Sequence, residues 1–452
     1  MDFGHRNRTR WPNHTLLTYT LPAAGQGEGE RSVGREENNL ESISTRDREI
    51  LRRRAQIQLD YAKSQQNDVI LKMWHAQAEG RREAPPVRLL FSNFGHEVIT
   101  PRLQCVGEQA RRIESQLLGT LVGRELFDDD TPISPTFDMG WHAHVQPFGI
   151  AAKVTRAAGP NAQGFHIDPV ISNLAAEIDK LHGGSFGVDR EGTARRREFL
   201  QDIFGDILPV RMVMGSLPGS ITNPLVHLMG MEAYYMAMYD CPDAVHRVME
   251  MATSVYERYY DFLETEQLLL PTNGLSPLAQ ESFAFTNELP TGVVARTTEC
   301  WGFLESQETT AVSADTFGEF VFPYQQRLVE RFGLLSYGCC ERVDAIWPDY
   351  LSKWSKLRKL SVSPFNAEAR VGEYLRGTRV VYYSKPRAEF VTCDGPMNDE
   401  AITTYFKGVC EAASGCLFEI AQREVGTIFN DFERGRRYVR LAKEAVDRYW
   451  RP

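Results

Sequence analysis

Short apolar runs alternate with amphipathic helical stretches along most of this 452-residue chain. A parallel sheet joined by crossover helices produces this alternation, and eight such units are typical of a (β/α)8 barrel of the α/β class. We therefore expect a TIM barrel with insertions. The strand-like runs are residues 87–91, 136–145, 208–214, 268–270, 334–337, 360–363, 380–383 and 416–421; the helical stretches between most of them are 222–238, 242–264, 313–331, 344–356, 366–376 and 398–413.

The N-terminal part of the chain has a different character. Residues 1–45 are polar, aperiodic and rich in Gly, Glu and Arg, which predicts a flexible arm. Residues 46–79 contain neither Gly nor Pro and carry apolar residues at helical spacing, so we expect an N-terminal helical extension over 46–84. The barrel itself is expected over 85–452, with one further helix over 103–121.

Composition excludes several classes of function. A net charge of −9 argues against a nucleic-acid-binding surface, which needs clustered positive charge. No apolar run approaches the ~20 residues of a membrane span, and the N-terminus lacks the apolar core of a secretory signal. The eight cysteines are scattered and form no CxxC pair, which favours reduced thiols and a cytoplasmic location.

The run that ends at Tyr337 is the most informative for chemistry. Gly338 is followed by two adjacent thiols and a carboxylate, Cys339, Cys340 and Glu341. Thiolates beside a carboxylate can bind a metal, or form a nucleophile with a nearby base, and barrel enzymes place their chemistry at strand ends. The alternative is that both cysteines are small core residues. Because successive strand residues face opposite sides, only one thiol should point inward unless the turn begins there.

Histidine ligands can come only from the N-terminal half, because the last of the ten histidines is His246. His142 and His144 are spaced i, i+2, so on a strand both imidazoles lie on one face and could bind a metal. The alternative is a hydrogen-bonded pair on a solvent-facing extension.

Several other polar residues follow apolar runs. Glu305 comes directly after Trp301–Leu304, where a buried carboxylate would be a metal ligand or a general base with a raised pKa; alternatively it caps the helix that begins near residue 313. Asn273 and Lys385 follow the fourth and seventh runs and could bind a substrate carbonyl or anion.

The last run leads into Arg423 and Glu424. Glu424 could donate an oxygen to a metal, or the two side chains could form a structural ion pair.

Several motifs together resemble the uroporphyrinogen decarboxylase superfamily, which includes corrinoid-dependent methyltransferases. They are Val312–Tyr324 (VSADTFGEFVFPY), Tyr337–Glu341 (YGCCE), Leu357–Pro364 (LRKLSVSP) and Tyr383–Pro386 (YSKP), and they resemble a little-characterised branch that carries YGCCE. The resemblance spans roughly residues 85–450. It implies a (β/α)8 barrel, a homodimer and one deep pocket at the C-terminal mouth.

The methyltransferases of that superfamily bind zinc through a His-x-Cys pair and a later Cys, and the metal holds a thiolate that attacks a methyl group on a corrinoid. This chain departs from the pattern, because Tyr337 occupies the His position beside Cys339, and Gly426 stands where the branch has a His. The arginine-rich MRQAGRY motif of true uroporphyrinogen decarboxylases is also missing, so we expect no turnover of uroporphyrinogen.

The sequence therefore predicts a zinc-assisted methyltransferase that acts on a small molecule, with a corrinoid protein as a candidate methyl donor. The alternatives are a decarboxylase or lyase of a small carboxylic acid, and an inactive barrel that serves as a binding subunit. The expected catalytic residues are Cys340, Glu305 and Glu341; the expected substrate-binding residues are Asn273, Tyr337, Lys385 and Arg423; the expected metal ligands are Cys339, Cys340, His142, His144 and Glu424.

Overall fold

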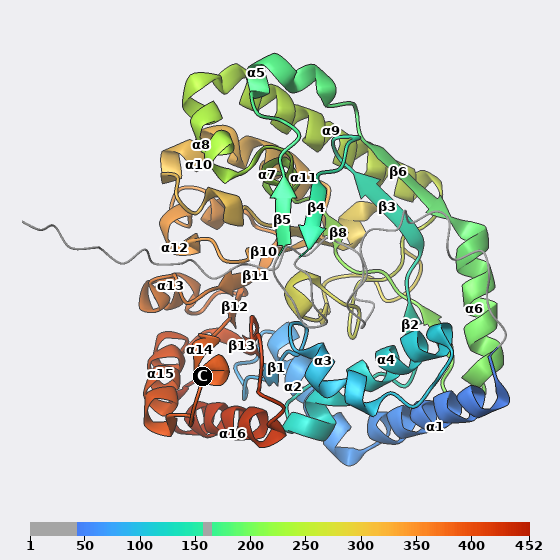
Figure 1. Cartoon of the computed structure of the whole chain (residues 1–452). Helices are drawn as coiled ribbons and strands as arrows, with labels where there is room; N and C mark the ends of the chain where they lie inside the picture. The colour runs from blue at the N-terminus through green and yellow to red at the C-terminus, as the bar shows by residue number, and fades with distance from the viewer. Residues whose placement is uncertain (1–42, 157–164) are drawn as a thin grey trace, which may run out of the picture.

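A parallel β-sheet of seven strands forms the centre of the computed structural model (Figure 1). The structure describes residues 43–156 and 165–452, so the arm expected over residues 1–45 falls almost entirely outside the described residues. Five strands that follow one another in the sequence, β9 to β13, are neighbours in the sheet. In sheet order the strands are β1 (Val87–Leu89), β13 (Leu417–Gln422), β12 (Val381–Ser384), β11 (Leu357–Val362), β10 (Leu334–Tyr337), β9 (Trp301–Leu304) and β8 (Leu217–Pro218).

The two edges of this sheet are β1 and β8, and among the described strands no ladder joins them into a ring. The predicted α/β class with a parallel sheet is confirmed. Closure into an eight-stranded barrel is not shown, because two of the expected strand regions pair with each other instead. They form β2 (Phe137–Met139) and β7 (Val210–Met212), a separate two-stranded parallel sheet.

The strand expected over residues 268–270 is wrong. This segment follows α9 without strand structure, although Leu268 and Leu269 are buried. The strand at this point of the fold is β9, an apolar run for which no strand was predicted from the sequence. The Oγ1 of Thr272 accepts a hydrogen bond of 2.8 Å from the backbone N–H of Trp301, so a side chain takes the place of a main-chain ladder here.

The single strand expected over residues 136–145 is two strands. After β2, the chain passes Gly140 and enters β3 (His142–Gln146), which pairs antiparallel with β6 (Ser185–Asp189). A third small antiparallel pair joins β4 (Lys153–Arg156) and β5 (Phe165–Asp168). The predicted histidine ligands thus lie on a strand outside the seven-stranded sheet.

Several expected helices are interrupted for identifiable reasons. The stretch over 46–79 breaks at Ser64, whose hydroxyl caps the second helix by accepting the N–H of Asn67. The stretch over 222–238 breaks at Gly230, which has a φ of +82°. Within the described ranges the longer α-helices are α1 (Thr45–Ala62), α2 (Gln65–Ala78), α4 (Glu108–Val122), α6 (Arg190–Phe204), α7 (Thr222–Met229), α8 (Met231–Asp240), α9 (Pro242–Thr265), α11 (Phe322–Glu330), α13 (Glu368–Leu375), α15 (Asp399–Ala412) and α16 (Phe432–Tyr449), and the shorter ones are α3 (Gly95–Val98), α5 (Leu174–Glu177), α10 (Ala314–Phe320), α12 (Val343–Ile346) and α14 (Glu389–Thr392).

Across the described ranges, no helix combines the length and the hydropathy that a bilayer span requires.

Side chains that alternate along each strand give the seven-stranded sheet an apolar and a polar face. On the apolar face, Leu335, Leu360, Tyr382 and Phe418 pack into the main hydrophobic core, which also contains residues of α13, α15 and α16. In Figure 1 the orange and red helices α12, α13, α15 and α16 lie outside strands β11 to β13. Burial of this face on helices is what a βαβ arrangement requires.

The opposite face of the sheet carries charged and polar side chains. Lys359 of β11 and Glu419 of β13 form a buried ion pair, with 2.7 Å between the lysine Nζ and the glutamate Oε1. Ser282 completes the group, because its hydroxyl accepts from Lys359 and donates to Glu419. Buried charges in proteins are ordinarily paired in this way.

The loop between α9 and β9 covers this polar face. The backbone carbonyl of Gln280 accepts the hydroxyl of Tyr383 at 2.7 Å, and the carbonyl of Glu281 accepts a guanidinium N–H of Arg88 at 2.5 Å. Farther along the loop, Phe283 packs edge-on against Trp74 of α2. The loop therefore binds to both the strands and the N-terminal helices.

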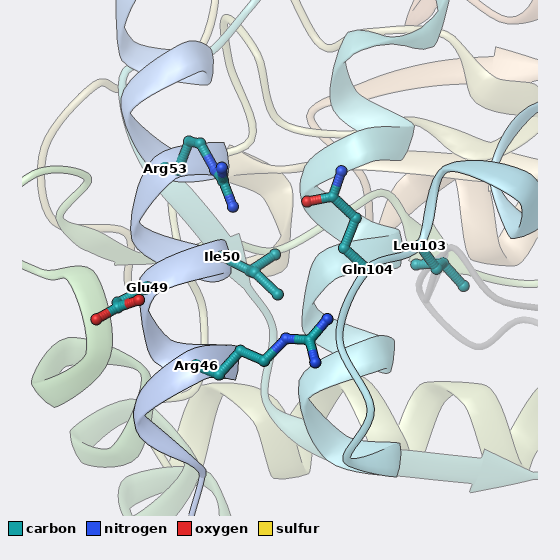
Figure 2. Close-up of a pocket in the computed structure, with 6 residues that line it drawn as sticks. All are labelled: Arg46, Glu49, Ile50, Arg53, Leu103 and Gln104. Carbon is teal, nitrogen blue, oxygen red and sulfur yellow. The ribbon is translucent and has the colours of Figure 1, made fainter.

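A groove of about 420 Å³ lies on the surface between α1 and the segment that precedes α4 (Figure 2). It is lined by Arg46, Glu49, Ile50, Arg53, Leu103 and Gln104. None of the predicted site residues lines this groove; they lie elsewhere, most of them at the ends of the strands.

Candidate active site at the ends of the strands

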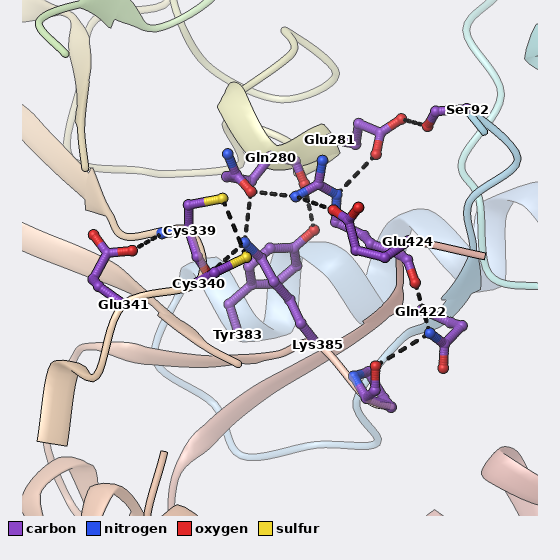
Figure 3. Close-up of polar contacts among 12 residues, drawn as sticks. Ser92, Gln280, Glu281, Cys339, Cys340, Glu341, Tyr383, Lys385, Gln422 and Glu424 are labelled. Carbon is purple, nitrogen blue, oxygen red and sulfur yellow. Dashed lines mark hydrogen bonds and ion pairs between the residues drawn. The ribbon is translucent and has the colours of Figure 1, made fainter. Parts of the chain in front are cut away.

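The turn after β10 brings two thiols together. Gly338 has a φ of +100°, a conformation that glycine adopts without steric cost, and its N–H donates to the carbonyl of Leu304. The chain leaves the strand here, and the Sγ atoms of Cys339 and Cys340 lie 3.7 Å apart (Figure 3). The sequence predicted that only one of the two thiols would point inward unless a turn began at this point. The turn does begin at Gly338, so both thiols can lie on the same side.

The two thiols are not equivalent. The hydrogen bond from Cys339 is the main cause that lowers the pKa of Cys340, and the charge of Lys385 acts in the same direction against burial. The same hydrogen bond, together with burial, raises the pKa of Cys339. With Cys339 as the hydrogen-bond donor, Cys340 is therefore the thiol of the pair that loses its proton more readily.

Two buried cations approach the thiols from neighbouring strand ends. Lys385, just past β12, donates to the carbonyl oxygen of Cys339 at 3.0 Å and to the Oε1 of Gln280 at 2.5 Å. Arg423, just past β13, donates an Nη1 hydrogen to the same Gln280 oxygen. Burial lowers the pKa of Lys385, and the nearby thiols oppose that effect. A single amide oxygen thus accepts hydrogen bonds from both cations.

Among the described residues, Arg423 is the one of these two cations that forms ion pairs with carboxylates. The Nε of Arg423 lies 3.0 Å from the Oε2 of Glu281, and its Nη1 lies 3.7 Å from the Oε1 of Glu424. Burial would raise the pKa of Glu281, but the charges of Arg423 and Arg88 and the hydrogen bonds from Ser92 and Arg423 together outweigh it, and the pKa is lowered. The predicted pairing of Arg423 with Glu424 is thus present but secondary to the pairing with Glu281.

Glu341 connects the ends of β9 and β10. Its Oε1 accepts the backbone N–H of Ser306 at 2.9 Å, and its Oε2 accepts that of Cys339 at 2.6 Å. Both oxygens of this buried carboxylate are therefore engaged by the backbone. The contacts position the segment that carries the thiols.

Glu305 and Glu308 are buried, and both are close enough to Glu341 for its charge to act on them. Burial is the first cause that raises the pKa of Glu305 well above that of an ordinary carboxyl group, and the charges of Glu308, Glu341 and the Cys339 thiol add to it. The pKa of Glu308 is also raised by burial, but Asn223 and Thr222 each donate a hydrogen bond of 2.8 Å to its carboxylate. Glu305 therefore keeps its proton to a higher pH than an ordinary carboxyl group does. The alternative of a cap does not apply, because Ser313 caps α10.

Replacement of Glu305 by Gln is expected to stabilise the fold at neutral pH. The folded protein keeps a proton on Glu305 at a pH where the unfolded chain has lost it, so the carboxyl group costs stability as pH rises above its ordinary pKa of about 4.3. Glu305→Gln should raise the melting temperature at about pH 7 and leave it nearly unchanged at about pH 4. The same variant should lose activity if Glu305 supplies a proton. A lower melting temperature at both pH values would contradict the neutral state of Glu305.

Two predicted substrate-binding residues make contacts of a structural kind. The hydroxyl of Tyr337 lies fully buried, 2.8 Å from the Oγ of Ser306, and its ring packs on Trp354. The side-chain amide of Asn273 donates to the carbonyl of Pro290 within the covering loop. The structure does not bring either of them to the thiols through a recorded contact.

The predicted zinc ligands do not assemble. His142 and His144 lie on β3, which pairs with β6 and not with the strands that carry the thiols. In residues 43–156 and 165–452, no three or more His, Cys, Asp or Glu side chains are grouped so that they could hold a metal ion. The donor set predicted from the sequence, two thiols with two imidazoles and Glu424, therefore does not fit a zinc site in this conformation.

No role of their own was predicted from the sequence for three residues of the site, Gln280, Glu308 and Lys359. Gln280 lies in an irregular loop, and no local pattern marks it. Glu308 was noticed only as a neighbour of Glu305. Lys359 could have been found, because Lys359, Ser361 and Ser363 repeat with the two-residue period of a strand face inside an otherwise apolar run.

Comparison with known proteins gives limited guidance. No protein-family model matches the chain, and no curated protein matches it. Among the solved structures that do match is a methyltransferase from Methanosarcina mazei, with a TM-score of 0.49 and 12% sequence identity over 84% of this chain and 98% of that chain. The functional assignment therefore depends on the side chains of the site.

Proposed function

We propose that this chain is an enzyme of the methyltransferase kind, in which the Cys340 thiolate attacks a carbon atom of a small substrate. The hydrogen bond from Cys339 to Cys340 carries the proposal, because it stabilises a thiolate beside the ammonium of Lys385. A thiolate with a lowered pKa is an effective nucleophile near neutral pH.

The step that methylates Cys340 needs no reactant besides the methyl donor, and a methyl acceptor then takes the group from Cys340 to complete a turnover. The Cys340 sulfur donates an electron pair to the methyl carbon, and the bond between that carbon and its leaving group breaks, so the leaving group departs with the bonding electrons. The neutral carboxyl group of Glu305 is a proton source for a basic leaving group. Glu341 holds the Cys339 backbone in place through the step.

Zinc assistance and a corrinoid methyl donor are part of what the resemblance implies. The predicted zinc ligands of this chain do not lie together, so in the proposed step the nucleophile is the Cys340 thiolate and not a zinc-bound thiolate. A corrinoid protein as the source of the methyl group stays a prediction from the resemblance.

A second candidate is a lyase that acts on a small carboxylic acid. Lys385 and Arg423 favour it, because two cations could hold a carboxylate near the neutral acid Glu305. A lyase of this kind would not leave a methyl group on Cys340. Detection of S-methylated Cys340 therefore distinguishes the methyltransferase from the lyase.

Methyl transfer can be trapped with a general methylating reagent. Purified protein incubated with limiting methyl 4-nitrobenzenesulfonate should acquire a methyl group first on Cys340, as mapped by peptide mass spectrometry. Cys241 and Cys393 are partly exposed thiols and serve as internal references, Cys241 as the reference with no recorded cation contact among the described residues and Cys393 as the reference that accepts from the guanidinium of Arg434. The Cys340→Ala variant should lose only the fast modification. Equal rates at Cys340 and at the two references would contradict an activated thiolate.

A further inference from the structure

We propose that the substrate is a small carboxylate, whose oxygens bind Lys385 and Arg423 in the place that the Gln280 side chain occupies in this structure. The inference depends on the proposed function, since the bound carboxylate would present its electrophilic carbon to Cys340. Three features of the site support it: an ammonium group without a carboxylate partner, two cations that share one acceptor, and a strained residue that supplies this acceptor.

Lys385 is a buried cation whose two side-chain hydrogen bonds go to neutral acceptors. Its two hydrogen bonds go to the carbonyl of Cys339 and the amide oxygen of Gln280, and among the described residues it forms no ion pair with a carboxylate. An ammonium group has three N–H donors, so one remains for another acceptor. The thiols offset part of this buried charge, and the anionic group of a substrate would pair it through the remaining donor.

Arg423 and Lys385 meet at a single oxygen. The Oε1 of Gln280 accepts from both, as a carboxylate oxygen would, and Figure 3 shows Gln280 and Lys385 beside the two thiols. Arg423 also binds Glu281 through Nε, which orients the guanidinium and leaves the Nη1 edge for Gln280. A carboxylate would form stronger, charge-assisted hydrogen bonds to the same donors than the amide does.

The residues that supply this acceptor have an unusual backbone. Gln280 and Glu281 are consecutive non-glycine residues with φ angles of +63° and +61°, and Glu424 on the other side of Arg423 has a φ of +60°. Left-handed conformations are rare for such residues and concentrate at ligand sites and at segments that switch. Release of Gln280 from the two cations would relieve part of this strain. Glu424 is partly exposed and can turn to solvent as an anion enters.

Two alkylating reagents of nearly equal size test the proposal. Iodoacetate carries a carboxylate, and iodoacetamide is its neutral analogue; each forms a sulfur–carbon bond to Cys340 and releases iodide. A free thiolate reacts faster with the neutral reagent, because two like charges repel. At Cys340 we expect the opposite order, with a preference for iodoacetate of about tenfold and saturation at high concentration, whereas Cys241 and Cys393 keep the ordinary order. Peptide mass spectrometry follows each site separately.

Matched variants of Gln280 sharpen the result. Gln280→Ala removes the resident acceptor and should raise the rate with iodoacetate several-fold without a similar effect on iodoacetamide. Gln280→Glu places a carboxylate on the two cations and should lower the rate with iodoacetate below that of the unaltered protein. Arg423→Met and Lys385→Met should each remove the preference. Circular dichroism and melting temperature confirm that each variant is folded.

The outcomes separate this inference from the proposed function. If iodoacetamide modifies Cys340 quickly but iodoacetate shows no preference, the carboxylate site is wrong and the activated thiolate stands. If neither reagent modifies Cys340 faster than Cys241 and Cys393, the proposed function itself fails. An equal response of the Gln280→Ala and Gln280→Glu variants would overturn the assignment of Gln280 as the group that a substrate carboxylate displaces.

Discussion

Replacement of Lys359 by Met is expected to lower the free energy of unfolding by about 3–5 kcal/mol, because it leaves the carboxylate of Glu419 buried without its cation. The pair lies on the polar face of the sheet, where Lys359 is 3% and Glu419 2% exposed. Only Ser282 would remain as a hydrogen-bond donor to the carboxylate. The midpoint of urea unfolding, followed by circular dichroism, measures the change.

Two further variants control this prediction. The double variant Lys359→Met/Glu419→Leu should recover most of the lost stability, since it removes both charges together. Lys407 forms an exposed pair with Glu411 across 3.9 Å, and Lys407→Met should change stability by less than about 0.5 kcal/mol. If the single variant Lys359→Met is as stable as the Lys407→Met control, the buried pair does not hold the covering loop to the sheet as described.

Removal of the Cys340 thiol is expected to lower the rate of group transfer at least ~100-fold, because no other group replaces the nucleophile. Cys339→Ala should lower the rate about 10- to 100-fold, since it removes a hydrogen bond to a charged acceptor worth about 1.5–3 kcal/mol. Cys339→Ser keeps a donor at that position and should restore much of the loss. The rate of methylation by methyl 4-nitrobenzenesulfonate measures all three variants.

A purely structural role for Cys339 gives a different pattern. In that case Cys339→Ala and Cys339→Ser would lower the rate in proportion to their melting temperatures, and the pH dependence of the reaction would not move. If Cys339 instead stabilises the Cys340 thiolate, Cys339→Ala should shift the pH dependence of the methylation rate to higher pH while the melting temperature changes little.

The sequence predicted the class of the fold well because periodic burial determines it. The runs at 334–337, 380–383 and 416–421 lie on or within one residue of strands, since each is short, β-branched or aromatic, and buried on a helix layer. The strand predicted over Leu268–Leu270 is absent, because a buried apolar run need not pair with other strands through its backbone. Trp301–Leu304 was missed as a strand although it has the same character.

The candidate site was predictable only where it follows a strand. Cys339, Cys340, Lys385 and Arg423 could be named because a polar residue after a buried strand lies at the sheet's edge. The orientation of Cys340 toward Cys339 depends on the positive φ of Gly338, which no local pattern specifies. Gln280 could not be named, because its place is set by contacts to strands more than 100 residues away in sequence.

The pH dependence of Cys340 alkylation by iodoacetamide tests the central claim most directly. A thiolate held by Cys339 and Lys385 persists below the ordinary thiol pKa of about 8.5, so the rate at Cys340 should fall to half of its maximum well below that pH. Cys241 and Cys393, followed in the same samples, provide the reference profiles. Burial alone acts in the other direction, as at Cys410, where it raises the pKa to about 12. A midpoint for Cys340 at or above 8.5 would therefore show that burial prevails and that Cys340 is not the activated thiolate of this site.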